Sequence, residues 1–157
     1  TAGAPSGVNV QFLGTGEEGG LPYCDIRILG IADANAASHR VSFNDNTNAA
    51  ATAGQAWGLD FRAKLIAGSA PSVVARLAAY ATGSLLAGAN DSGATTPDAT
   101  VKYLSVRKVL ADPTANNVRG SIVMPLVNGV TYDFMIRIYA PFGRRVRDVR
   151  SATGRGM

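Results

Sequence analysis

The sequence is poor in the residues that most catalytic and metal chemistry uses. Its 157 residues include one cysteine, Cys24, and one histidine, His39. One cysteine cannot form an intrachain disulfide, and the two residues are too few for a zinc site of histidine and cysteine ligands. No Gly-x-Ser-x-Gly nucleophile elbow accompanies the histidine. We therefore expect a protein that is not an enzyme and that holds no metal and no cofactor.

Long apolar runs are also missing. No stretch approaches the roughly 20 apolar residues that a membrane-spanning helix needs, so we expect no membrane span. The glycine-rich segment 14–20 lacks the lysine–serine or lysine–threonine pair of a phosphate-binding loop. Within it, Glu17 and Glu18 point opposite ways on an extended chain and so make a poor acid–base pair. We expect this segment to be a flexible loop and both glutamates to be solvated.

The net charge of +4 comes entirely from the end of the sequence. Residues 1–142 hold ten basic and ten acidic side chains, so this part is neutral. The segment 143–157 adds one aspartate and five arginines, which are Arg144, Arg145, Arg147, Arg150 and Arg155. Arginine donates paired hydrogen bonds to phosphate and to carboxylate. This tail is predicted to contact nucleic acid or acidic groups of a neighbouring subunit, or else to be a solvated tail.

Segments with the two-residue period of a β-strand recur along the chain. Apolar and polar side chains alternate in 8–13, 59–65 and 132–139. Other strand-like segments, separated by clusters of Gly, Pro, Asn and Asp, are 23–32, 40–43, 100–110 and 118–123. The pattern predicts one all-β domain over residues 1–142, a β-sandwich or jelly roll of about seven to eight strands. Residues 1–7 and 143–157 are expected to be extended N- and C-terminal arms.

Residues 71–87 are compatible with two structures. Pro71 and Gly83 would suit the start and the end of a helix through the alanine-rich segment between them. The same residues also alternate as in a strand, with a turn at 82–84 and a returning strand at 85–87. Because the surrounding segments are all β, we expect the hairpin.

Two loops are rich in asparagine and aspartate. Residues 44–48 read Asn-Asp-Asn-Thr-Asn, and residues 90–93 read Asn-Asp-Ser-Gly. Each loop holds one carboxylate, whereas calcium takes six to eight oxygen ligands and prefers several carboxylates. The ordinary turn chemistry of Asn and Asp accounts for both clusters.

Trp57 and the first strand are further candidates for contacts with a ligand or partner. A buried Trp57, which we expect, would anchor the core or an interface, whereas an exposed one could stack on a sugar ring. The first strand follows a turn-rich arm. Its apolar residues Val8, Val10 and Phe12 could add to the sheet edge of a neighbouring subunit, or pair within their own domain.

Together these features favour a structural subunit of a large assembly, such as a capsid, decoration or tail protein in the virion of a virus or phage. Its partners would be copies of itself, other particle proteins and, at the arginine-rich tail, nucleic acid. The first alternative is an extracellular filament, pilus or adhesin subunit at the cell surface, joined by strand exchange. The second alternative is a carbohydrate-binding module that uses Trp57 and the Asn/Asp loops.

Overall fold

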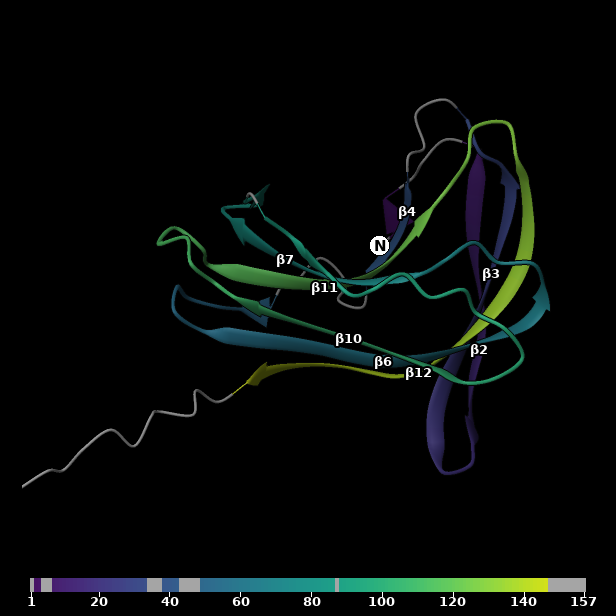
Figure 1. The fold of residues 1–157 in the computed structure, drawn as a ribbon, viewed down its shortest axis with the longest axis horizontal. Helices are drawn as coiled ribbons and strands as arrows, with labels where there is room; N and C mark the ends of the chain where they lie inside the picture. The colour runs from purple at the N-terminus through teal and green to yellow at the C-terminus, as the bar shows by residue number, and fades with distance from the viewer. Residues whose placement is uncertain (1, 4–6, 34–37, 43–48, 87, 147–157) are drawn as a thin grey trace, which may run out of the picture.

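Two antiparallel β-sheets packed face to face make up the fold. The structure is a computed structural model that describes residues 2–3, 7–33, 38–42, 49–86 and 88–146 (Figure 1). These residues form eight strands of five residues or more and four strands of two residues. The all-β sandwich predicted from the sequence is therefore confirmed. Within the described ranges, no helix is long and apolar enough to cross a membrane.

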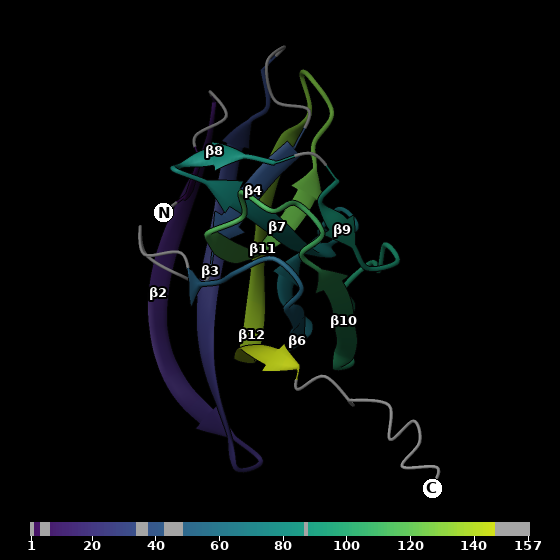
Figure 2. The same cartoon turned by 90° about the vertical axis from the view of Figure 1, so that its left-hand side faces the viewer.

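One sheet has five strands in the order β10-β6-β12-β3-β2. Figure 2 shows these strands side by side behind the second sheet. The central strand β12 pairs along one side with β3, so that Thr131 lies opposite Ile31, and along the other side with β6. The strands are β2 (Val8–Glu18), β3 (Leu21–Ile31), β6 (Ala56–Gly68), β10 (Lys102–Val109) and β12 (Thr131–Val146).

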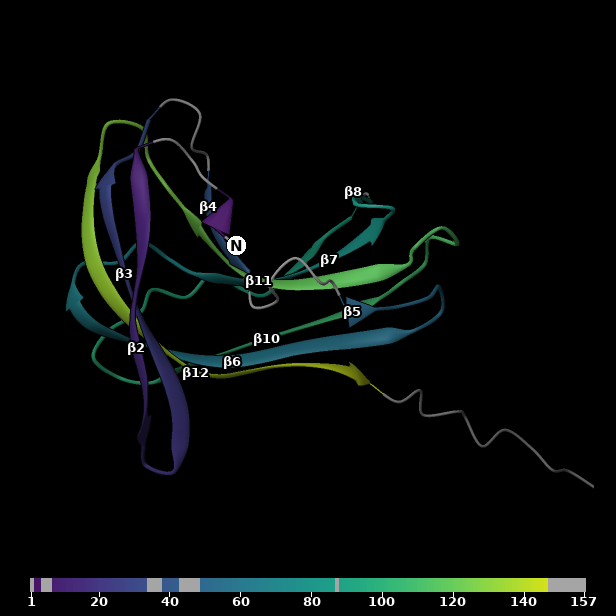
Figure 3. The same cartoon turned by 180° about the vertical axis from the view of Figure 1, so that it is seen from behind.

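The second sheet has the order β1-β4-β11-β7-β8, with β5 paired to β11 and β9 paired to β7. It stacks on β6, β10 and the C-terminal half of β12 (Figures 1 and 3). The predicted hairpin is confirmed, since β7 and β8 pair across a turn at Thr82 and Gly83. The strands are β1 (Ala2–Gly3), β4 (Ser38–Ser42), β5 (Ala49–Ala50), β7 (Val74–Ala81), β8 (Ser84–Leu85), β9 (Asn90–Asp91) and β11 (Asn117–Pro125).

The hydrophobic core fills the space between the two sheets. In β6 the strand period turns Leu59, Phe61 and Ala63 inward, where each is at most 2% exposed. Burial of a Leu, Ile or Phe side chain stabilises a fold by about 1.5–3 kcal/mol. The largest fully buried side chains are Phe61, Phe134, Ile28, Leu59, Leu77, Leu104, Leu110, Ile122, Met124, Ile136 and Ile138. In β6, the residues between the buried ones, such as Asp60, Arg62 and Lys64, face outward.

Strand β2 continues through part of the segment 14–20, so the expected flexible loop is wrong there. Residues from Gly14 to Glu18 pair with β3 after a β-bulge at Leu13, and the turn is confined to Gly19 and Gly20. Pairing with β3 satisfies the backbone of a segment whose side chains alone gave no strand signal. The β2–β3 hairpin extends beyond β6 and β12 (Figures 1 and 3).

Both expected arms begin inside the folded domain. Ala2 and Gly3 pair with β4 of the same chain. At the other end, β12 runs to Val146, and the backbones of Arg144 and Arg145 pair with β6. The boundary expected after residue 142 therefore falls within a strand. The remaining tail arginines, Arg147, Arg150 and Arg155, lie outside the described residues.

Candidate functional site

A row of tyrosines crosses the outer face of the five-stranded sheet. Tyr103 of β10 lies opposite Arg62 of β6, and Arg62 lies opposite Tyr139 of β12. Tyr139 in turn lies opposite Tyr23 of β3. Residues paired in this way point to the same face of the sheet, and neighbouring strands lie about 4.8 Å apart. We call these four residues the tyrosine row.

The members of the tyrosine row differ in accessibility. The Tyr103 side of the row is open, since Tyr103 is 62% exposed and Arg62 is also exposed. Tyr23 is half-buried, and Tyr139 is only 3% exposed. A ligand can therefore reach the row at Tyr103 and Arg62, while Tyr139 belongs to the packed part of the face.

Asp60 fixes the ring of Tyr103. The Tyr103 hydroxyl donates to Asp60 Oδ1 over 2.9 Å, and Nη1 of Arg107 donates to the same oxygen over 3.0 Å. Arg107 lies over Gly58, where a Cβ atom would come within 2.6 Å of its guanidinium nitrogen. Burial alone would raise the pKa of Asp60, but hydrogen bonds from Ser105, Arg107 and Tyr103 outweigh it, and the pKa is lowered. Asp60 is thus held ionised beside the exposed ring.

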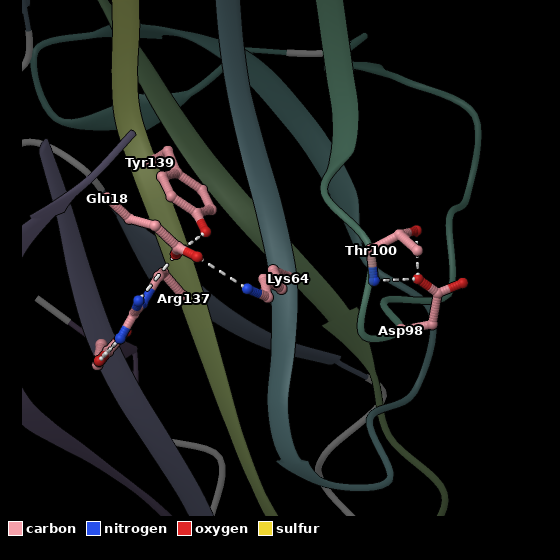
Figure 4. Close-up of polar contacts among 7 residues, drawn as sticks. Glu18, Lys64, Asp98, Thr100, Arg137 and Tyr139 are labelled. Atoms are coloured by element: carbon pink, nitrogen blue, oxygen red, sulfur yellow. Dashed lines mark hydrogen bonds and ion pairs between the residues drawn. The ribbon is translucent and has the colours of Figure 1, made fainter. Parts of the chain in front are cut away.

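Glu18 forms a second polar cluster next to the row. Its carboxylate accepts hydrogen bonds from the Tyr139 hydroxyl, from Nη1 of Arg137 at 2.9 Å and from Nζ of Lys64 at 3.0 Å (Figure 4). The bonds from Tyr139, Arg137 and Lys64, in that order of effect, lower the pKa of Glu18 to about 2. The expectation that Glu18 is simply solvated is therefore wrong. The β2–β3 hairpin brings this residue over β12 and β6.

Arg137 links Glu18 to the far end of the row. Its guanidinium donates two hydrogen bonds of 2.8 Å to Asp25 and stacks 3.5 Å from the ring centroid of Tyr23. Tyr23 also meets Tyr139 edge-on, with ring centroids 6.1 Å apart. The Tyr23 ring covers Gly16, where a Cβ atom would lie 2.5 Å from the tyrosine hydroxyl oxygen. Through these contacts, the Tyr23 end of the tyrosine row is packed against its neighbours.

Two further ion pairs flank the face. Asp98 accepts hydrogen bonds from the amide and hydroxyl of Thr100 (Figure 4) and pairs with Lys102 at 2.7 Å. Lys102 first, and then Thr100, lower the pKa of Asp98 to about 2. Arg27 and Asp133 pair through two bonds of 2.8 Å. A shallow pocket of about 280 Å³ adjoins them, lined by Arg27, Ala67, Gly68, Asp133, Phe134 and Met135.

The face is suited to binding a polar ligand. It offers one exposed aromatic ring together with charged groups held in place by other side chains. In the part of the chain that the structure describes, no group of three or more His, Cys, Asp or Glu residues is placed to hold a metal ion. Burial, and then the charge of Asp25, raise the pKa of the Cys24 thiol. The thiol is therefore kept in its neutral form and does not add a charge to this face.

Trp57 and the residues predicted for strand exchange lie outside the tyrosine row. Trp57 is on the inner face of β6, half-buried against the core, and its indole N–H donates to Gln55. Val8 is buried and Val10 half-buried, whereas Phe12 is 66% exposed, and all three lie in β2. Their strand pairs with β3 of the same chain.

The Asn/Asp segment at residues 90–93, which the structure describes, pairs with the other sheet rather than with the strands of the tyrosine row. Asp91 forms two hydrogen bonds of 2.6 Å with Arg76 of the other sheet. Residues 44–48 lie outside the described residues. The tyrosine row was not predicted as a site, although the alternation in 59–65 and 132–139 marks Arg62 and Tyr139 as facing one side of their strands.

The fold is similar to solved β-sandwich structures. A carbohydrate-binding module of the β-sandwich superfamily matches with a TM-score of 0.56 and 11% identity, over 92% of this chain and 56% of that chain. The CBM22-1 xylan-binding domain of Paenibacillus barcinonensis Xyn10C matches with a TM-score of 0.52 and 14% identity, over 92% and 85%. The enzymatically active domain of tailspike protein 4 from bacteriophage CBA120 matches with a TM-score of 0.52 and 12% identity, over 91% and 20%.

These similarities show a common fold and no more, because the identities are low. This chain spans about a fifth of the length of the tailspike chain and about half of the first module. No protein-family model and no curated protein matches the sequence.

Proposed function

We propose that this chain is a non-catalytic carbohydrate-binding module that holds its ligand on the outer face of the five-stranded sheet. The observation that carries the proposal is Tyr103, an exposed ring fixed by Asp60 and adjacent to Arg62. A sugar ring has an apolar C–H face that stacks on an aromatic side chain and hydroxyl groups that bond to charged neighbours. Tyr103 thus takes the role that the sequence suggested for Trp57.

Two further observations support the proposal. The fold is similar to that of carbohydrate-binding modules. The carboxylates of Asp60 and Glu18 are occupied by cations and hydroxyl groups, and their pKa values are lowered. A general acid at neutral pH needs a raised pKa, so these residues are better suited to positioning than to proton transfer.

Replacement of Tyr103 tests the proposal. Affinity electrophoresis and calorimetry with xylan, mixed-linked glucan and polygalacturonate should detect binding to at least one polysaccharide. The Tyr103→Ala variant should bind that ligand about tenfold more weakly, a loss of about 1.4 kcal/mol, because the sugar loses the apolar surface of the ring.

The matched control is Phe12→Ala, which removes an equally exposed ring, 66% against 62%, from the opposite edge strand. Its affinity should equal that of the unmodified protein. Equal loss in both variants, or binding to none of the polysaccharides, would overturn the proposal.

A component of a phage particle is the second candidate, favoured by the similarity of fold to the tailspike domain. The two candidates are compatible, since a binding module can be carried on a particle. Both place the protein outside the cell or on a virion. Contact of the arginine-rich tail with nucleic acid or with a neighbouring subunit stays a prediction.

A further inference from the structure

The carboxylates on the outer face of the five-stranded sheet are each paired with a cation. Asp60 bonds to Arg107, and Glu18 bonds to both Lys64 and Arg137. The remaining pairs are Asp25 with Arg137 and Asp133 with Arg27. The negative charge of this face is therefore balanced locally by residues other than Arg62.

Among the cationic side chains of this face that the structure describes, Arg62 is the exception. It forms no ion pair with any carboxylate that the structure describes, although Asp60 and Lys64 are its nearest outward-facing neighbours along β6. Asp60 is engaged by Arg107 and Tyr103. The exposed guanidinium of Arg62 thus has no described carboxylate to compensate its charge in the middle of the tyrosine row.

The position of Arg62 relates this charge to the exposed ring. Arg62 and Tyr103 are directly opposite each other on adjacent strands, about 4.8 Å apart. A sugar stacked on Tyr103 would therefore have its ring substituents within reach of the guanidinium. Arginine presents a planar fork of N–H donors that matches the two oxygens of a carboxylate.

We infer that Arg62 binds the carboxylate of an acidic sugar, so that the ligand is a polyuronate rather than a neutral glycan. The inference rests on the proposed function, because it takes Tyr103 as the stacking residue. It adds the chemical class of the ligand, which the fold alone does not specify.

The experiment compares each polysaccharide with a form of the same backbone that has no charge. The probes are polygalacturonate and alginate, each tested beside its carboxyl-reduced form by calorimetry. We expect the unmodified protein to bind at least one polyuronate at least tenfold more tightly than the reduced form. Arg62→Gln should weaken binding of the polyuronate at least tenfold more than it weakens binding of the reduced form, so that the preference disappears. Arg62→Lys should restore the preference only in part.

The control variant is Arg119→Gln, which removes the same charge from the other sheet, where Arg119 stacks on Tyr80. It should keep the preference for the polyuronate. If Arg119→Gln and Arg62→Gln weaken binding equally, long-range attraction explains the effect and the inference is wrong.

The failure of this inference can be told apart from failure of the proposed function. Equal affinity for the charged and the reduced polymers, lowered by Tyr103→Ala, would overturn the acidic ligand and retain the binding face. Absence of binding to every polymer would overturn both. Circular dichroism of each variant establishes that a loss of binding is not a loss of fold.

Discussion

Glu18 joins three strands of the five-stranded sheet through one carboxylate. It lies near the tip of the β2–β3 hairpin, while its partners are Tyr139 and Arg137 on β12 and Lys64 on β6. An exposed ion pair alone contributes little to stability, but several bonds that share one carboxylate form a network. This network holds the end of the hairpin against the face that carries Tyr103.

The Glu18 network should make stability sensitive to acid. The pKa of Glu18 is about 2 in the folded protein and 4.5 as its ordinary value. A lowered folded pKa contributes stability that is present above the ordinary value and lost as the pH falls towards the folded value. Thermal unfolding of Glu18→Gln should therefore occur below that of the unmodified protein at pH 7, and the difference should shrink between about pH 4.5 and pH 2. A difference that does not change across this range would show that the network is absent in solution.

The hairpin of β2 and β3 depends on a close approach of backbone. Gly30 of β3 has a φ of 131°, and a Cβ atom there would lie 2.0 Å from the carbonyl oxygen of Gly7. Gly30 also pairs with Val8, which belongs to the core. Any side chain at this position must separate the two strands or distort the backbone.

Substitution of Gly30 by alanine should destabilise the protein strongly. Backbone strain at positive φ costs about 1–3 kcal/mol, and the collision with Gly7 adds to it. The matched control is Gly129→Ala, where φ is 78° and nothing lies within 4 Å of the added Cβ atom. Urea unfolding should give a larger loss for Gly30→Ala than for Gly129→Ala. Equal losses would contradict the close approach.

The elements were predictable where the strand period is regular. Alternation in 59–65 and 132–139 identified β6 and much of β12. The period gave no sign of the second half of β2, because Gly14 and Gly16 interrupt it. The reason for a glycine at position 16 is visible only in the structure, where the Tyr23 ring lies over it and leaves no room for a side chain.

The candidate site was not predictable, because it depends on which strands are neighbours. Tyr103, Arg62 and Tyr139 form a row only because β6 lies between β10 and β12. Nothing in the local sequence specifies that order. Trp57 was a candidate on residue type alone, and the strand period of β6 turns it towards the core.

At the scale of the whole molecule, the five-stranded sheet has two edge strands, β2 and β10. Exposed edges invite pairing with other chains unless bulges or lysines interrupt them. β2 carries a bulge between Phe12 and Gly14, and β10 carries Lys102 and Lys108. These features disfavour edge-to-edge association through either strand.

We therefore expect the protein to be a monomer in solution. Native mass spectrometry and light scattering across a range of concentrations should give a mass near 16.2 kDa. A closed homo-oligomer of defined size would instead favour the particle subunit over an independent binding module.

The alternation of Leu59, Asp60, Phe61 and Arg62 along β6 has a consequence for how this fold can diverge. Leu59 and Phe61 pack in the core, whereas Asp60 and Arg62 face outward and are not part of it. Exchange of the outward side chains at Arg62 or Tyr103 would change the chemistry of this face while leaving the core intact. Substitutions on the outer face can therefore accumulate during evolution without loss of the fold. Sandwiches of this shape can persist long after their sequences have ceased to resemble each other.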